Sequence, residues 1–350
     1  MFTVLVAIII TLFVAIQDPI IQKFAVRFAS GYLSEKTGSD IKVGRLWITP
    51  DLRVFIENVT AKDLKNNDIA HIDVLKTKID ILDLLDGEIH IETVELSGTQ
   101  ANIVKYEGED KFNFAFIIEA FVTDTVEKPD KEPIPIIIDK ISLRNVDFVY
   151  WDQNKDKPEK TEQNLMDYAH IAVSGIDLDA TDFYMLGDSI HANIGLLRGQ
   201  ELSGLDIKHF HSNVTVCSKG VFLDGMEMET NNSLFDLDLH MLFDDFSALS
   251  DFVNKVEFDA TIRPTDVLLS DIGYFSSVMY KMPNRLQLKG RFTGPIEHFH
   301  LDDFVAQFGK ATKIQGSLSM HPLNFNDGEH RLNIKKMHFV DEVLRCQRRI

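Results

Sequence analysis

The spacing of apolar residues changes twice along the chain, and each change marks a predicted element. Residues 1–17 carry no charged side chain, and almost every residue from Phe2 to Ile16 is apolar. A membrane-spanning helix needs about 20 apolar residues, with a lower limit near 17. The basic start of a signal peptide is missing, and the bulky Phe13 lies where a cleavage site needs a small residue. We therefore predict a retained membrane anchor rather than a signal peptide or a buried core helix. Its apolar residues are Phe2, Val4, Leu5, Ile8, Ile9, Leu12, Phe13 and Ile16.

The next segment, residues 18–38, has the period of an amphipathic helix. Apolar residues recur at i, i+1, i+4 and i+5 from Ile20 to Leu33, after Pro19 and before a stop signal at Gly38. Such a helix can cap the end of a sheet, whose open edge must be covered, or it can lie on a bilayer surface. We favour the capping role.

From Ile41 onward apolar and polar residues alternate, which is the period of β-strands. The alternation slips in phase near Val94, which indicates a β-bulge. Ser97 to Thr99 has the composition of a turn, so we predict that the strand before it pairs back with residues 101–103. The other elements predicted in this part are strands at 41–48, 52–56, 69–81 and 89–96, a helical turn at 82–87, a helix at 111–121 and a charged linker at 123–133.

Beyond the linker the alternation becomes more regular. The run from Phe235 to Met241 places apolar residues on one face and Asp236, Asp238 and His240 on the other, the pattern of a half-buried antiparallel strand. Short helices are predicted at 246–252 and 266–274. A small or turn residue beside an apolar–polar–apolar–polar run recurs at irregular intervals, which fits a meander of strands stacked in series. Its copies lie near Val94, Ile141, Gly175, Gly204 and Gly225.

These patterns predict a mainly β fold, in which an anchor and an amphipathic helix precede a long curved antiparallel sheet with a few short helices. A closed sandwich would bury the apolar face under a second sheet, but the sequence supplies few elements to cover it. We predict an open groove instead, whose exposed apolar surface binds an apolar ligand. The candidate groove-lining residues are Met226, Met228, Phe235, Leu237, Leu239 and Met241, for each of which a core position is an equal alternative.

Several segments resemble the TamB proteins of the AsmA-like group, in a Bacteroidetes-type version. The resemblance is most specific in the first 121 residues and looser in the Gly290–Gly309 region. The segments that carry it are Pro19–Ala25, Tyr32–Gly38, Ile41–Arg45, Phe55–Val59, Ile79–Gly87 with Ile89–Ile91, Val94–Leu96 and Phe112–Phe121. The resemblance implies a single-pass bacterial inner-membrane protein whose bulk lies in the periplasm as a β-taco groove.

The resemblance also implies a domain order and partners. The expected order is an anchor at 1–17, a capping helix at 18–38, an AsmA-like β domain at 39–122, a linker at 123–133 and continuing groove repeats at 134–350. The expected partners are phospholipid acyl chains, the inner membrane and a BamA-like outer-membrane barrel. Relatives of this kind are longer, and the basic end Leu344–Ile350 breaks the alternation, so we expect a truncated copy that lacks the barrel-binding part.

Composition adds limits to this picture. The chain has 54 acidic and 36 basic residues, a net charge of −18, which argues against nucleic acid as a partner. We assign the acidic residues to the solvated face of the strands. The 25 Phe suit the opposite, apolar face, since Phe has no polar group. The two cysteines, Cys217 and Cys346, form no metal-binding spacing, and Cys217 is predicted to be a free, buried thiol within a strand.

Motifs for catalysis or cofactor binding are missing from the sequence. No phosphate-binding glycine loop, GxSxG or HExxH is present, so we predict no enzyme, no cofactor and no metal. The pairs His209/His211 and His298/His300 have two-residue strand spacing, but no third ligand supports a metal site. The acidic residues between Phe222 and Ala260 alternate along strands, as expected for a solvated face.

The predicted function is therefore transport of phospholipid or hydrophobic protein segments between the two membranes, as the resemblance implies for outer-membrane protein assembly and lipid transport. The alternative is a structural scaffold that binds protein partners by adding strands to a sheet edge. A hydrolase of envelope glycans is a third hypothesis, for which no carboxylate pair is positioned.

Overall fold

The computed structural model describes residues 18–49, 51, 53–79, 89–121, 135–156, 165–245, 248, 255–275, 279–280, 282–296, 298–309, 312–324 and 329–341. The fold is mainly β, and its strands form a mixed sheet that does not close on itself. The chain divides into two compact units. Unit 1 comprises Met1–Glu159, Asp167–Phe183 and Gly199–Leu202, and unit 2 comprises Lys160–Met166, Tyr184–Arg198 and Ser203–Ile350.

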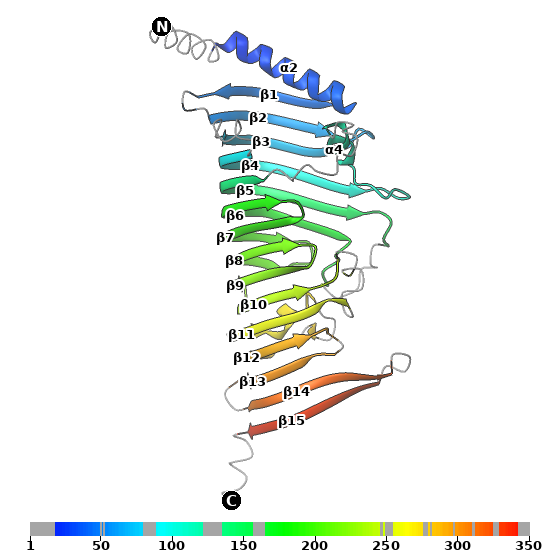
Figure 1. Ribbon diagram of the computed structural model, residues 1–350, viewed down its shortest axis with the longest axis vertical. Helices are drawn as coiled ribbons and strands as arrows, with labels where there is room; N and C mark the ends of the chain where they lie inside the picture. The colour runs from blue at the N-terminus through cyan, green and yellow to red at the C-terminus, as the bar shows by residue number, and fades with distance from the viewer. Residues whose placement is uncertain are drawn as a thin grey trace, which may run out of the picture. The chain divides into compact units, whose positions relative to one another are not determined.

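Unit 1 contains helices as well as strands, and the strands follow one another in the sheet in chain order (Figure 1). Its elements are α2 (Pro19–Thr37), β1 (Ile41–Ile48), β2 (Arg53–Lys62), β3 (Asp68–Ile79), β4 (Ile89–Lys105), α4 (Ala115–Phe121) and β5 (Ile136–Asp152). Strands β6 (His170–Leu186) and β7 (Ser189–Glu201) have residues in both units. The strand predicted at 41–48 is confirmed, whereas the strand predicted at 52–56 continues to Lys62 and the helix predicted at 111–121 begins only at Ala115.

The prediction of a purely antiparallel sheet is wrong for one pair of strands. Strands β4 and β5 are parallel, with Ile89 beside Ile136 at one end and Lys105 beside Asp152 at the other. Parallel neighbours need a long connection that returns the chain to the starting end of the first strand. Residues 106–135, which include α4, provide that connection. A tight hairpin in their place would have made β5 antiparallel to β4.

Helix α2 lies along β1, the first strand of unit 1 (Figure 1). The Asp18 side chain caps its start by accepting the Ile20 N–H at 2.7 Å, and Gly38 ends it at a left-handed φ of 70°. The hydroxyl of Ser34 accepts the Ile41 N–H at 3.1 Å and donates to the Ile41 carbonyl at 3.0 Å. These bonds satisfy backbone groups of β1 that would otherwise form an open sheet edge.

A line of bulged residues crosses the strands of unit 1. Asn58 of β2, Gly98 of β4 and Asn145 of β5 have φ values of 53°, 59° and 53°, in the left-handed region that favours Gly and Asn. Gly98 and Asn145 lie side by side, because Ser97 pairs with Arg144 before them and Thr99 pairs with Val146 after them. We call these three residues the bulge line. Each of them shifts the alternation of its strand by one residue, so that the apolar residues on both sides stay on the same face.

The hairpin predicted around Gly98 is therefore wrong. Strand β4 continues through Ser97 and Thr99 without reversing, because one residue in the left-handed region makes a bulge rather than a turn. The phase slip predicted near Val94 is confirmed, since the pairing of β3 with β4 shifts register between Lys78 and Ile79.

Unit 2 consists of antiparallel strands that also follow chain order. They are β8 (Asp206–Cys217), β9 (Gly220–Thr230), β10 (Leu234–Leu242), β11 (Glu257–Leu268), β12 (Arg285–Gly294), β13 (His300–Phe308), β14 (Thr312–Asn324) and β15 (Glu329–Asp341). The helix predicted at 266–274 is mostly wrong, because residues up to Leu268 pair with β12 and leave only α6 (Leu269–Ile272). Bulges recur at Gly225 of β9 and Asp303 of β13, with φ of 61° and 48°.

Some predictions fall on residues that the structure does not describe. These are the anchor at 1–17, the helical turn at 82–87, the linker at 123–133, all but one residue of the helix at 246–252, and the basic end at 344–350. Among the helices that are described, none has the length and apolar character needed to cross a bilayer. The anchor and the domain boundaries built around it stay predictions from the sequence.

Candidate functional site: the apolar face of the sheet

In unit 1 the apolar residues of successive strands form continuous rows on one face. Side chains at paired positions of neighbouring strands lie on the same face and contact one another. One row takes a single large apolar residue from each strand, namely Leu46, Ile56, Leu75, Leu96 and Leu143. All five are neither buried nor fully exposed. This face of unit 1 is therefore apolar and only partly covered.

The same arrangement occurs in unit 2, across a larger number of strands. The longest row runs through Val214, Leu223, Leu239, Ala260, Phe292, Leu301 and Leu318. Within this row only Ala260 is buried, and the other members remain half-buried. A parallel row contains Met226, Leu237 and Ile262, and a third contains Phe210, Met228 and Phe235. We call these three rows the apolar face of unit 2.

The six candidate groove-lining residues share this side of unit 2 but differ in burial. Met226 is buried, at 7% exposure, and so is part of the packed interior. Met241 packs against a small buried cluster of Phe243, Ala248 and Val256, which covers one margin of the face. The remaining candidates are half-buried and lie in the rows described above: Met228, Phe235, Leu237 and Leu239.

The opposite face of unit 2 is polar and its charges are paired. Arg263 binds the carboxylates of Asp236 and Asp238, the latter at 2.7 Å, and Arg291 binds Asp259 at 2.9 Å. His240 lies 2.8 Å from Asp224. Four members of the acidic cluster predicted to be a solvated face, Asp224, Asp236, Asp238 and Asp259, thus lie on that face. Arg263 and Arg291, which lie outside the cluster in sequence, neutralise part of its charge.

Hydrogen bonds link this polar face to the bulges. The Gly225 N–H, which the bulge removes from the strand ladder, donates to Asp238 at 2.7 Å. That bond, assisted by Arg263, holds the pKa of Asp238 below its ordinary value although partial burial opposes it. Hydrogen bonds from Arg291 lower the pKa of Asp259 in the same way. Asp238 therefore stabilises the bulged backbone at Gly225, whereas Asp259 is held by the Arg291 side chain.

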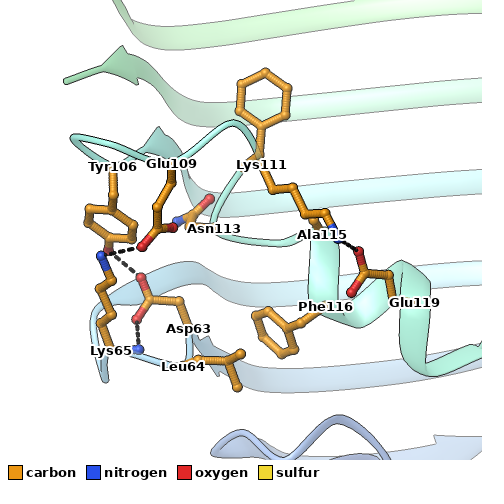
Figure 2. Close-up of a pocket in the computed structure, with 11 residues that line it drawn as sticks. Asp63, Leu64, Lys65, Tyr106, Glu109, Lys111, Asn113, Ala115, Phe116 and Glu119 are labelled. Atoms are coloured by element: carbon orange, nitrogen blue, oxygen red, sulfur yellow. Dashed lines mark hydrogen bonds and ion pairs between the residues drawn. The ribbon is translucent and has the colours of Figure 1, made fainter. Parts of the chain in front are cut away.

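A small cavity of about 220 Å³ lies beside α4 in unit 1 (Figure 2). The Tyr106 hydroxyl donates to the buried carboxylate of Asp63, and burial together with this bond raises the pKa of Tyr106. Asp63 also accepts the backbone N–H groups of Lys65 and Asn67 at 2.9 and 2.8 Å. Lys65 pairs with Glu109 at 2.7 Å. The network fastens the turn after β2 to the end of β4, and we interpret the cavity as structural.

One buried histidine contacts a carboxylate, as in a catalytic dyad, but both of its ring nitrogens are engaged. His170 is 3% exposed, and its Nδ1 lies 2.6 Å from Asp167. Its Nε2 lies 3.0 Å from the carbonyl oxygen of Asp152, so both ring nitrogens are engaged. The ring therefore has no nitrogen available to activate a nucleophile. We interpret it as a link between β5 and the start of β6.

The histidine pairs do not form a metal site in the described part of the chain. His209 and His211 both lie on β8, opposite Glu229 and Glu227, as their spacing predicts. No group of three or more His, Cys, Asp or Glu side chains among the described residues is arranged to hold a metal ion. Cys217 is a free thiol at the end of β8, as predicted, but it is half-buried and not buried as expected.

The sequence patterns did not correctly predict the positions at which strands continue through a left-handed residue. The recurrent motif near Val94, Ile141, Gly175 and Gly225 was interpreted as a strand beside a turn. Gly98, Asn145, Gly175 and Gly225 instead occupy left-handed positions inside continuous strands. The available signal was a Gly or Asn followed by a change in apolar phase. Comparison with protein-family models and with curated proteins gives no match to this chain.

Proposed function

We propose that this chain is a non-enzymatic envelope protein that carries phospholipid or hydrophobic protein segments along an apolar groove between the inner and outer membranes. The apolar face of unit 2 is the observation that supports the proposal, because its rows continue from strand to strand while most members stay half-buried. A curved β-taco groove, an inner-membrane anchor and a periplasmic location complete the proposal and come from the sequence resemblance.

The energetics of such a face favour an acyl ligand. Burying one methylene group contributes about 0.8 kcal/mol, and burying apolar surface contributes roughly 25 cal/mol per Å². An acyl chain lying along the longest row would cover apolar surface on Leu223, Leu239 and Phe292 that water otherwise contacts. Neighbouring rows are all formed by apolar side chains. A ligand can therefore move along the face while keeping most of its hydrophobic binding energy at each step.

The test is mass spectrometry of the lipids that the purified full chain retains. Leu239→Lys places an ammonium group on the apolar face, where it lies beside Ala260. Thr261→Lys is the matched control, since Thr261 follows Ala260 on β11 but pairs with Asp238 on the polar face. We expect L239K to lower retained phospholipid by on the order of tenfold, because excluding an acyl chain from a charged site costs more than about 1.4 kcal/mol.

The control decides how a loss is interpreted. T261K is expected to retain lipid at the level of the parent protein, and circular dichroism should show β-structure in both variants. Equal retention by L239K and T261K would overturn the lipid-carrier proposal. If the parent protein retains no lipid but crosslinks to a protein through an edge strand, the scaffold function replaces it.

A further inference from the structure

Helix α2 turns a stripe of large apolar side chains toward the solvent. Ile20, Phe24, Phe28 and Tyr32 are 77%, 67%, 65% and 49% exposed, and their four-residue spacing lines them up along one side of the helix. We call these four residues the outer stripe. The helix packs on β1 through its serine side, so the outer stripe is not the surface that caps the sheet.

Basic residues lie next to the outer stripe. Lys23 and Arg27 of α2 and Arg45 of β1 line a cavity of about 590 Å³ between the helix and the strand. Neither Lys23 nor Arg27 forms an ion pair with a described residue, and Arg45 is 3.4 Å from Glu57. This concentration of positive charge contrasts with the chain as a whole, whose net charge is −18. The local charge is complementary to an anion.

The combination of apolar stripe and flanking cations identifies the kind of partner. An amphipathic helix with aromatic and aliphatic side chains on one side and Lys or Arg beside them suits the interface of an anionic bilayer. A second copy of the chain fits poorly, because pairing two outer stripes would bring Lys23 and Arg27 of both copies together. The uncharged segment 1–17 precedes α2, separated from it only by Asp18, which brings the helix close to any membrane that this segment enters.

We propose that α2 docks on the surface of a bilayer that contains anionic phospholipid. The outer stripe inserts among the acyl chains near the headgroups, and Lys23, Arg27 and Arg45 bind lipid phosphates at the cavity. The same helix caps β1 with its other side, so docking positions the first strand of unit 1 directly beside the membrane surface. This docking does not depend on whether the sheet carries lipid.

The test measures immersion of α2 itself, so that insertion of residues 1–17 cannot imitate it. The full chain, with Cys217→Ser and Cys346→Ser, is labelled with an environment-sensitive fluorophore at Phe24→Cys or, as a control, at Lys36→Cys. Lys36 is exposed and lies near the end of the helix, more than three turns from Phe24 and about 120° around the helix axis from it. Phosphatidylglycerol vesicles with brominated acyl chains should quench the label at position 24 and leave the label at position 36 in water.

A second pair of variants tests the role of the cations. The double variant Lys23→Glu/Arg27→Glu should raise the lipid concentration needed for half-maximal quenching by on the order of tenfold, since each basic residue near an anionic surface contributes appreciably to binding. Lys36→Glu should have a much smaller effect. A label at position 24 that stays in water overturns the proposal, as does equal quenching in phosphatidylcholine vesicles. Shielding of the label before vesicles are added, with a doubled molecular mass, would assign the outer stripe to a second copy instead.

Discussion

The bulge at Gly225 provides a quantitative test of how the apolar face is built. Its φ of 61° lies in the left-handed region, and a Cβ atom added there would meet no atom within 4 Å. A substitution at this position therefore changes only backbone conformational energy and creates no steric clash. Residues other than Gly pay about 1–2 kcal/mol in this region, with Asn an exception and β-branched residues the least tolerated.

These costs predict an order for three variants. Gly225→Asn should change the free energy of unfolding by only a few tenths of a kcal/mol, because Asn58 and Asn145 adopt this conformation elsewhere in the chain. Gly225→Ala should destabilise by about 1 kcal/mol, since the reduced entropy of the unfolded chain offsets part of the strain. Gly225→Val should lose about 2 kcal/mol or more, because a β-branched residue is strained at positive φ.

The measurement combines urea unfolding with amide hydrogen exchange of β9 and β10. Exchange should accelerate first at the Gly225 N–H, whose acceptor is Asp238, and at the neighbouring pairs that hold Leu223 and Met226 on one face. Asn145→Gly and Asn145→Val repeat the comparison in unit 1 and should follow the same order. If G225V unfolds at the same urea concentration as G225N, the left-handed bulge is not required and our account of the apolar face is wrong.

Three further predictions concern the helix and the polar face. Replacing Ser30 and Ser34 by Ala should speed exchange of the β1 amides, with a loss of about 1 kcal/mol for each lost hydrogen bond; unchanged exchange would show that α2 does not protect this edge. Gly31→Ala should stabilise α2 by up to about 1 kcal/mol, seen as greater helix protection, because nothing lies within 4 Å of the added methyl group. The pKa values of Asp238 and Asp259 are lowered in the folded state, so their ionised carboxylates stabilise the fold above the ordinary pKa of about 3.9. This stability is lost as pH falls through the lowered pKa values, and the urea midpoint of unfolding should fall with it. A urea midpoint that does not change between roughly pH 5 and pH 2.5 contradicts this prediction.

Local patterns predicted much of the secondary structure correctly. The helix ending at Gly38 and the strand at 41–48 follow from short-range physics, namely a left-handed stop residue and a two-residue alternation. The run from Phe235 to Met241 is β10, with its apolar and acidic residues on opposite faces as predicted. These features depend on residues close in sequence, which is why a single sequence reveals them.

Long-range pairing explains the predictions that failed. Gly98 has the sequence context of a hairpin turn, but β4 continues through it, paired on both sides with a strand more than forty residues later in the sequence. The parallel pairing of β4 with β5 likewise cannot be predicted from the alternation of apolar and polar residues, because that pattern does not indicate the relative direction of two strands. The sequence also did not indicate which α2 side chains bond to the sheet. Ser30 and Ser34 do so, because β1 presents backbone groups that their hydroxyls satisfy.

Local patterns are enough to predict strands with one apolar and one acidic face, preceded by an amphipathic helix. Side-chain periodicity is a local property and does not depend on which strands pair. The folded chain adds that the rows join across strands into a partly uncovered apolar face, and that the outer stripe of α2 points away from the sheet. Both outcomes depend on register and on which backbone groups need partners, and these are set by contacts between residues far apart in the chain.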